Sequence, residues 1–529
     1  MIRRQVLGLL AATMLAGPLL TACGGQDAES NEDHLLRVTA IGYIDSTDPH
    51  RANSGPEHIL AGETHLGLVT VDASGQIVPG LAESWWVGED GLSYIFRLRP
   101  AQWDDETPLT PNDVVASFRR MVARNTGHPL AEWLVRIRNG EAVRQGRMRP
   151  SELGVRALTD TVVEISLEEP RPAFLALLAE PSVAIVRQVR RDGRSVLLGL
   201  GPYRITSQND QHLTLAANES PLMPEKPGYN RIDFTAVSDP LVGVQRFREG
   251  AADLVVGGSI GGLAEAKTLP APAVARFEPV FGVYGYVAQT RKGPLADVRL
   301  RRALAMTIDR QGLAKQMFGL PGMTPVESLV PQGFSSYGDP ATPGWASWPL
   351  DQRLTEARRL VAEAGYGPDK PLPISVLLPP APEHQQVLDA VAASWRELGI
   401  EVSAKIAEPR VYLETVSRGE FDLALRPILI SIDQPQVFLA PFTCNAPDNA
   451  GGFCIPEADQ LMQDAGKADA PAMRAGLMKE AEQLMVEEAP LIPLFTPVRW
   501  SLVREGVEGW VDNPLGRHPL SSLSPQATK

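Results

Sequence analysis

The pattern that most constrains the fold lies between residues 372 and 406, where two short apolar segments flank a longer amphipathic one. The stretch "PISVLL" has the length and composition of a buried strand, and "IEVSAKI" alternates apolar and polar residues as a half-buried strand does. Between them, "EHQQVLDAVAASWREL" repeats apolar residues at helical spacing, and Gly399 follows it. This order predicts a βαβ unit, so we expect a mixed α/β chain.

Two further segments support the same fold class. In "PLTPNDVVASFRRMV", Thr110 is a good N-cap, Pro111 suits the first helical position and Asp113 completes a capping box, so a helix is predicted to begin here. The stretch "VYLETVSRGEFDLALR" predicts a helix that ends at Gly419 and a strand that begins at Phe421. Proline and glycine, 46 of each, separate such segments without forming a repeat, so helices and strands are expected along the whole body.

The amino-terminal residues have the features of an export signal. Two arginines precede an apolar run from Val6 to Leu20, which is shorter than the roughly 20 residues of a membrane-spanning helix. The run ends in "LTAC", which resembles the bacterial lipobox, so residues 1–22 are predicted to be a signal peptide and Cys23 to become the lipidated first residue. Residues 23–35 are expected to be a solvated tether. A signal that merely ends near a cysteine is the alternative, and either Sec or twin-arginine export and either membrane fit the sequence.

The charge of the chain argues against one class of partner, and its cysteines predict a disulfide. Acidic residues number 63 and basic residues 50, which gives a net charge of -13 and argues against a nucleic-acid partner. The two cysteines that remain after export, Cys444 and Cys454, flank a short polar loop and are expected to form a disulfide, because exported proteins reside where disulfides persist. No histidine lies nearby in the sequence, so no metal site is expected there.

A literal G-x-S-x-G motif at Gly257, Ser259 and Gly261 suggests a serine hydrolase, and we weigh it against an ordinary glycine-rich turn. A hydrolase of that kind needs an acid and then a histidine downstream, and only His384 and His518 are available. The turn is the preferred interpretation, so no catalytic residue, no enzymatic activity and no cofactor are predicted. Three earlier histidines, which are spaced too widely to form a metal-ligand pair one helical turn apart, carry no metal prediction: His50, His58 and His65.

A long ordered string resembles a known family. Residues 65–121 contain "PGLAESW", "GLSYIFRLR" and "TPLTPNDV" in the order found in the extracytoplasmic solute-binding proteins of peptide ABC transporters, family 5. The resemblance continues through "GLGPYRI", "FREGAADLVV", "PLADVRLRRALAMTIDR" and "RGEFDLAL", and spans about residues 36–510. The insertion "NGEAVRQGRMRPSELGV" is most similar to the oligopeptide-binding branch.

This resemblance implies the fold class α/β, as a two-lobed periplasmic binding protein (type II, Venus flytrap) with an additional α+β domain on the first lobe. The chain would cross between the lobes near "PVFGVYGYVAQT" and "LIPLFTPVRW". The expected boundaries are 36–66, 190–278 and 495–529 for lobe I, 67–189 for the additional domain and 279–494 for lobe II.

The family also implies a function and partners. Members enclose a solute between the two lobes and deliver it to a permease, so we expect a monomeric, membrane-anchored lipoprotein of the periplasm or extracytoplasmic space. Its partners would be an oligopeptide or peptide-like ligand, an ABC permease in the inner membrane, and the membrane itself through the lipid anchor. A sensory or chaperone-like binding protein without a transporter is a further alternative.

The ligand-binding residues are carried over by position from the oligopeptide-binding relatives. The resemblance places Asn53, Ser54 and Gly55 on one ligand-lining strand. It places Pro427, Ile428 and Leu429 on the other, where the neighbouring Arg426 either attracts a carboxylate or phosphate or lies in solvent at the rim. In relatives the peptide lies extended, with its main chain paired to these strands.

One departure from the family pattern bears on the ligand. Relatives carry a motif like W-x-A-D-Y-x-[DE]-P, whose first aspartate neutralises the peptide α-ammonium, and this chain has Ser431 at that position. Either Asp433, two residues on, pairs with the amine in a shifted register, or the ligand has no free amine. The second possibility keeps open a non-peptide solute such as an opine, a sugar conjugate or a metal chelate. The disulfide of the relatives is not expected, because Gly282 stands where one of its cysteines falls.

Overall fold

A computed structural model gives the fold of the chain. The structure describes residues 34–171, 174–191, 193–218, 222, 226–270, 273–317, 319–320, 323–334, 336–430, 434–446, 448–468, 470–513 and 515–526. The predicted signal peptide, Cys23 and all but the last two residues of the predicted tether lie outside these ranges. Within them, no helix combines the length and the apolar character needed to span a membrane.

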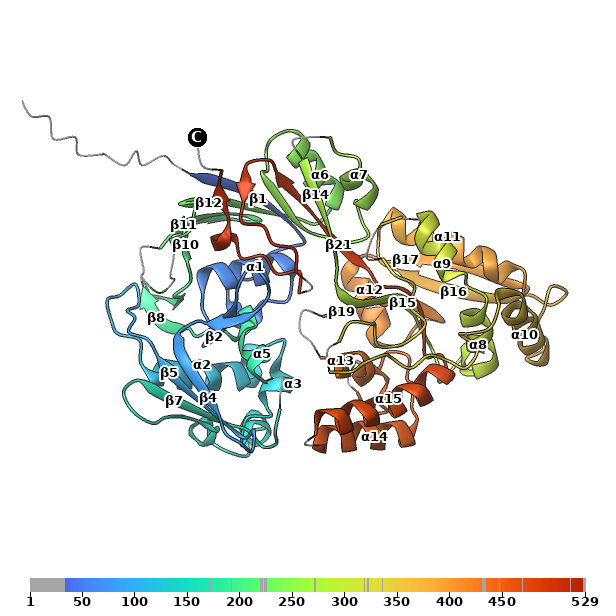
Figure 1. The fold of residues 1–529 in the computed structure, drawn as a ribbon, viewed down its shortest axis with the longest axis horizontal. Coiled ribbons are helices and arrows are strands. Elements are labelled where there is room, and N and C mark those ends of the chain that lie inside the picture. The colour runs from blue at the N-terminus through green and yellow to red at the C-terminus, as the bar shows by residue number, and fades with distance from the viewer. Residues whose placement is uncertain are drawn as a thin grey trace, which may run out of the picture. The chain divides into compact units, whose positions relative to one another are not determined.

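The first sheet has seven strands in the order β10-β11-β12-β1-β13-β21-β14 (Figure 1). Its central strand β1 runs parallel to both neighbours, and Val38 is paired with Phe234 on one side and with Leu254 on the other. Helix α1 covers one face through Leu60, whereas α6 covers the other. The strands are β1 (Leu35–Ile41), β10 (Tyr203–Asn209), β11 (His212–Ala217), β12 (Arg231–Val237), β13 (Leu254–Gly258), β14 (Ala273–Pro279) and β21 (Val498–Arg504), and the helices are α1 (Gly55–Thr64), α6 (Pro240–Arg248) and α7 (Leu263–Lys267).

The second sheet has six strands, in the order β17-β16-β18-β15-β19 with β20 also paired to β15. Strands β16 and β17 are parallel and joined by α11, whose Val387, Val391 and Trp395 are buried against the sheet. The predicted βαβ unit is therefore confirmed. The strands are β15 (Phe281–Ala288), β16 (Leu372–Leu378), β17 (Ile400–Ile406), β18 (Leu423–Leu425), β19 (Ile428–Ile430) and β20 (Leu491–Phe495), and α11 is Pro382–Arg396.

A smaller four-stranded sheet, ordered β4-β5-β7-β6, has its own buried core with helix α2. Helix α2 begins as predicted, with Pro111 as its first residue, and the Thr110 amide donates a hydrogen bond of 2.8 Å to the Asp113 carboxylate. Its Val114 and Phe118 are buried in that core. The elements are β4 (Ala82–Val87), β5 (Ser93–Leu98), β6 (Val155–Ala157), β7 (Val162–Ser166) and α2 (Pro111–Val122).

The remaining elements connect and cover these sheets. The remaining helices are α3 (Ala131–Leu134), α4 (Gly140–Arg144), α5 (Phe174–Leu178), α8 (Val298–Met306), α9 (Arg310–Met317), α10 (Leu350–Glu363), α12 (Pro409–Ser417), α13 (Gln436–Leu439), α14 (Pro456–Lys467) and α15 (Pro471–Glu487). The short paired strands are β2 (Val69–Val71) with β3 (Ile77–Pro79), β8 (Arg187–Arg191) with β9 (Arg194–Leu198), and β22 (Val507–Glu508) with β23 (Ser524–Pro525).

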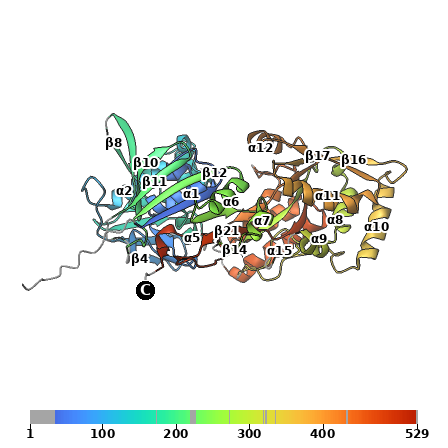
Figure 2. The same ribbon diagram turned by 90° about the horizontal axis from the view of Figure 1, so that it is seen from above.

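The chain passes between the two large sheets at two places. Strand β14 belongs to the first sheet and β15, which begins two residues later, belongs to the second; β20 and β21 repeat this step in the other direction. The two crossings lie side by side, because the Val280 amide donates to the Pro497 carbonyl and the Tyr284 ring stacks on Phe495 at 4.7 Å between centroids. In Figure 2, β14, β21 and α7 occupy the centre of the view, where these crossings occur. The residue boundaries given above for the lobes stay a prediction.

Candidate functional site

The predicted ligand-lining residues of lobe I begin a helix instead of forming a strand. Ser54 is the N-cap of α1, with extended backbone angles, and Gly55 is the first residue of the helix. The Ser54 hydroxyl accepts the Glu57 amide and donates to the Tyr43 carbonyl at 2.6 Å. The expectation of a strand was wrong at this point because Ser54, Pro56 and Glu57 have the spacing of a capping box with proline in the first turn. Asn53 and Gly55 are exposed, whereas Ser54 is buried.

Glu57 organises the loop that precedes this helix. One carboxylate oxygen accepts the amides of Asp45 and Ser46, at 2.7 and 2.8 Å, and the other accepts the amides of Asn53 and Ser54, at 2.8 and 3.2 Å. The side chain is buried, with 2% of its surface exposed. Sequence reasoning missed this residue, although a glutamate three positions after a serine N-cap is a recognisable signal.

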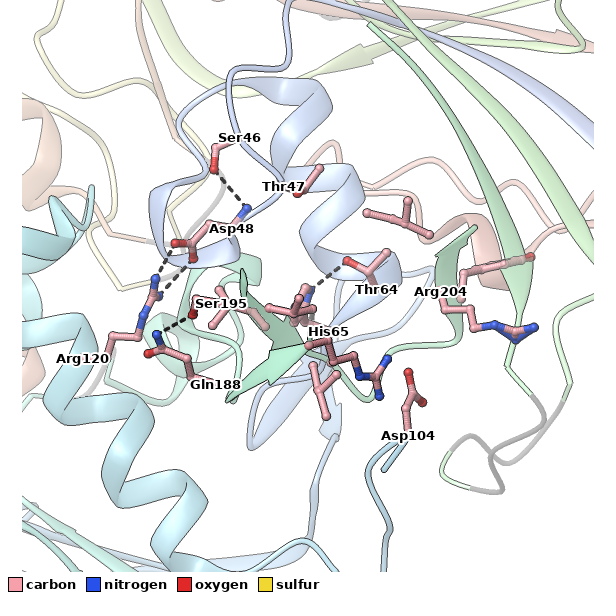
Figure 3. A pocket seen from close by; sticks show the side chains of 17 residues that line it. Ser46, Thr47, Asp48, Thr64, His65, Asp104, Arg120, Gln188, Ser195 and Arg204 are labelled. Carbon is pink, nitrogen blue, oxygen red and sulfur yellow. Dashed lines mark hydrogen bonds and ion pairs between the residues drawn. The ribbon is translucent and has the colours of Figure 1, made fainter. Parts of the chain in front are cut away.

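The same loop is held to the additional domain by charged and aromatic side chains. Asp48 forms an ion pair with Arg120 of α2 (Figure 3). The Arg120 guanidinium also lies 2.6 Å from His50 Nδ1. Burial alone would raise the pKa of Asp48, but the hydrogen bond and charge of Arg120 outweigh it and lower that pKa. The other ring nitrogen of His50 lies 2.8 Å from the Ala184 carbonyl, and burial lowers the pKa of His50 to about 3.

The other two histidines considered as metal ligands are His65 and His58. His65 Nδ1 lies 2.8 Å from the Thr64 hydroxyl, and burial lowers the pKa of His65 to about 4. Burial also lowers the pKa of His58. No cluster of three or more potential metal-ligating side chains occurs in the described residues.

A cavity of about 520 Å³ borders this loop, and Figure 3 shows side chains that line it. Its wall includes Asp48, His65 and Asp104 together with the β8–β9 hairpin. A second cavity of about 1270 Å³ shares Arg204 with the first, and part of its lining comes from residues 100–109. Neither cavity includes a predicted ligand residue among its described lining; both are lined by residues predicted to belong to lobe I and to the additional domain.

The predicted ligand-lining residues of lobe II do form a strand. Ile428 and Leu429 belong to β19, which pairs antiparallel with β15 so that Leu429 lies opposite Gly282. Strand β19 is the last strand in the described order of its sheet, and the Leu429 side chain is 38% exposed. Pro427 precedes the strand and has no amide hydrogen to donate. Ser431 and Asp433 lie outside the described residues. They are the residues predicted to decide whether the site can bind a ligand with a free amine.

Gly282 has a packing role of its own. A Cβ atom there would lie 2.6 Å from the Leu429 side chain and 3.0 Å from the Ile428 carbonyl. The position therefore needs glycine so that β19 can lie close to β15. Sequence reasoning identified the residue only as the replacement of a cysteine found in relatives.

A disulfide-closed loop holds the start of β19. Cys444 and Cys454 form a disulfide, and the loop between them contains Asp448. The Arg426 guanidinium donates to the Asp448 carbonyl at 2.9 Å and lies 3.4 Å from its carboxylate, and the Arg426 amide donates to Gly285. The guanidinium predicted to meet either a ligand or solvent is thus paired within lobe II.

The G-x-S-x-G motif covers the last two residues of β13 and the glycine-rich turn that follows it. Gly257 has a positive φ of 86°, and a Cβ atom on Gly258 would lie 2.1 Å from the Trp500 ring. Both downstream histidines are paired away from Ser259: His384 lies 2.9 Å from the Tyr284 hydroxyl and His518 lies 2.8 Å from the Glu278 carboxylate. The glycines are explained by backbone conformation and close packing.

Two α/β lobes joined by two crossing segments, with an extra domain on the first, define a periplasmic binding protein of the two-lobed class. The model of the bacterial extracellular solute-binding proteins, family 5, matches residues 76–450. That range exceeds half of the chain, and the chain belongs to this family.

Relatives of known name extend over nearly the whole chain. The periplasmic oligopeptide-binding protein OppA of Salmonella typhimurium is 29% identical over 528 residues, which cover 98% of this chain and 96% of the relative. The probable deoxycholate-binding periplasmic protein YgiS of Escherichia coli is 28% identical and covers 96% of each chain. The crystal structure of Haemophilus influenzae OppA in complex with the peptide RPPGFSPFR superposes with a TM-score of 0.80 at 27% identity, covering 94% of this chain and 100% of that one. The oligopeptide-binding branch is thus the appropriate comparison.

Proposed function

We propose that this protein is the lipid-anchored solute-binding component of an ABC importer, which captures oligopeptides or peptide-like solutes and delivers them to a permease. The observation that supports the proposal is where the two segments predicted to line the ligand lie in the fold, one after the β1 strand of lobe I and the other on β19 of lobe II. A solute that contacts both segments stabilises the closed arrangement of the lobes, which the permease can recognise. Acting as a monomer is sufficient for this cycle.

The edge position of β19 supports a peptide ligand in particular. Among the described residues β19 is paired on one side only, which leaves main-chain groups available, and an extended peptide can pair with them while its side chains occupy pockets. The Haemophilus influenzae relative was crystallised in complex with the peptide RPPGFSPFR.

Two candidate ligand classes differ in whether they carry a free amine. With Ser431 in place of the relatives' aspartate, a free α-ammonium is bound only if Asp433 supplies the opposite charge. A non-peptide solute is the second candidate, because Ile428, Leu429 and Ile430 make an entirely aliphatic strand and one relative is named as probably deoxycholate-binding.

Calorimetry separates these ligands. The soluble body without residues 1–23, freed of carried-over ligand by unfolding and refolding, would be titrated with a tri- to pentapeptide pool, with the same pool N-acetylated, and with deoxycholate. Binding of the free pool alone would mean that the protein recognises the α-ammonium group of the peptide. Binding of both pools would mean that recognition of the peptide main chain is sufficient. Binding of deoxycholate alone would replace the peptide proposal with the second candidate.

We also propose that Cys23 carries the anchor, which would keep the binding protein near its permease by raising its effective concentration there. Replacing Cys23 with serine should move the protein from the membrane fraction to the soluble fraction. If the variant stays in the membrane fraction, the proposal that Cys23 carries a lipid anchor fails.

We further propose that the protein has no enzymatic activity. Its relatives are named as binding proteins, and the histidines that a hydrolase would need are paired with Tyr284 and Glu278. Labelling of Ser259 by a fluorophosphonate probe would overturn this proposal.

A further inference from the structure

We infer that Glu57 is a positioning residue for ligand binding: its carboxylate fixes the backbone of the ligand-lining segment Asn53–Gly55 before the ligand arrives. The inference rests on the proposed function for its consequence, a loss of affinity, but its structural part can be tested without any ligand. Glu57 lines neither of the two cavities described above and does not need to touch the solute.

The hydrogen-bonding capacity of the carboxylate is matched to this task. An ionised carboxylate has about four acceptor positions, and four main-chain amides occupy them here, those of residues 45, 46, 53 and 54. The side chain is 2% exposed, and among the described residues no lysine or arginine forms a salt bridge with it. A buried negative charge is costly unless it is hydrogen-bonded, so the hydrogen bonds from these four amides stabilise the Glu57 carboxylate.

The position of the four amides explains what the carboxylate controls. Residues 45 and 46 begin a loop and residues 53 and 54 end it, so one side chain ties both ends together at the start of α1. The middle of the loop is held to the additional domain through the Asp48–Arg120 pair. Without Glu57, the end that carries Asn53 keeps only the Ser54 bonds to Tyr43 and to the helix.

An amide cannot replace the carboxylate at this position. Glutamine offers one oxygen and one amino group, and the amino group would meet two amides that are themselves donors. Aspartate keeps the charge but is one carbon shorter, so it cannot reach both ends of the loop as glutamate does. Both variants should therefore release the segment, which would show that the charge and the length of the side chain are both needed.

Lobe II contains a matched control. Glu482 of α15 is fully buried and also accepts four hydrogen bonds, from the amides of Leu329, Val330 and Ala341 and from the Tyr337 hydroxyl. None of these partners is a predicted ligand residue. Glu482→Gln therefore removes the same kind of buried carboxylate, but from a residue whose hydrogen-bond partners lie outside both predicted ligand-lining segments.

The first measurement is amide hydrogen exchange in the ligand-free protein. Glu57→Gln and Glu57→Asp should each raise exchange of the amides of residues 45, 46, 53 and 54 by about tenfold or more, whereas Glu482→Gln should leave these four unchanged. Exchange in this loop that is unchanged in both Glu57 variants would overturn the inference, whatever the protein binds. If one variant does not fold, the other decides.

The second measurement is calorimetric titration with the free tri- to pentapeptide pool. If the parent binds, the Glu57 variants should lose about tenfold in affinity while Glu482→Gln stays within about twofold, even where both sites lose thermal stability. Equal affinity in parent and Glu57 variants would overturn the positioning role. If the parent does not bind the pool, the peptide proposal fails, and the exchange result alone supports or overturns the inference on Glu57.

Discussion

The two segments predicted to line the ligand are held in place by different chemistry. In lobe I, the loop before α1 is fixed by ionisable side chains: Glu57 gathers its amides, and Asp48 pairs with Arg120 beside the buried His50. In lobe II, β19 is fixed by main-chain pairing to β15 and by Arg426, which reaches into the loop closed by a disulfide.

This difference means that pH and reducing agents should act on different ligand-lining segments. Protonation changes the charges on which the lobe I loop depends, whereas a disulfide and a strand ladder do not titrate in the same range. Reduction opens the lobe II loop and leaves the carboxylate and histidine contacts intact. The predictions below challenge this separation, in order of expected effect.

Acid should give the largest effect. Burial lowers the pKa of His50 to about 3 and those of His65 and His128 to about 4, from an ordinary 6.5. Below pH 6.5 the unfolded state therefore binds protons that the folded state does not, so stability is present above pH 6.5 and falls as the pH drops toward these folded values. Burial also lowers the pKa of His384 in lobe II to about 4, so it adds to the effect. We expect the free energy of unfolding, measured in urea, to fall by roughly 6 kcal/mol between pH 6.5 and 4.5.

One buried acid works in the opposite direction. Burial raises the pKa of Glu63 to about 7 from 4.5, so its contribution is present below pH 4.5 and is lost as the pH rises through 7. It offsets part of the histidine effect, and the figure above allows for it. As a control, His128→Gln should have a flatter pH profile than the parent. A parent profile that is level from pH 6.5 to 4.5 would contradict the assignment of these histidines as neutral and buried.

Removing the charge of Asp48 should come next. Asp48→Asn leaves the Arg120 guanidinium, whose side chain is 24% exposed, without its partner beside His50. We expect a loss of about 3 kcal/mol at pH 7 by urea denaturation, because a largely buried cation without a counter-charge is costly. Asp72→Asn is a suitable control, since Asp72 bonds only within its own turn. Equal effects of the two substitutions would remove the ion pair as an anchor of the loop.

Opening the disulfide should have a somewhat smaller effect, confined to lobe II. Replacing both Cys444 and Cys454 with serine should lower stability by roughly 2 to 3 kcal/mol on the chain-entropy model, because the closed loop is short. Hydrogen exchange should rise around Asp448 and β19 and stay unchanged in the loop before α1. Increased exchange in both segments would show that the lobes do not hold them independently.

The fold was predictable from the sequence where the signals are local. The βαβ unit and the start of α2 depend on residues within one helix or strand, and both predictions hold. The strand predicted at residues 53–55 was wrong because the capping signal at Ser54 and Glu57 is local too but was outweighed by the positions carried over from relatives.

Much of the site was not predictable in this way. The Asp48–Arg120 pair joins residues 72 positions apart, and His50 meets the Ala184 carbonyl across 134 positions. Such contacts follow from how the sheets pack, and no spacing in the sequence indicates them. The need for Gly282 likewise arises only once Leu429 lies opposite it.

The smallest effect should come from the pair that joins Arg426 to the disulfide loop. The Asp448 side chain is 53% exposed and that of Arg426 27%, and the closer contact is to the Asp448 carbonyl, which survives replacement of the side chain. Asp448→Asn should therefore lower stability by less than about 1 kcal/mol. Combined with Arg426→Gln in a double-mutant cycle, the coupling energy should also stay below about 1 kcal/mol. A coupling above about 2 kcal/mol would mean that lobe II, like lobe I, depends on an ion pair to hold its ligand-lining segment, and the contrast between the two lobes would then reduce to the disulfide alone.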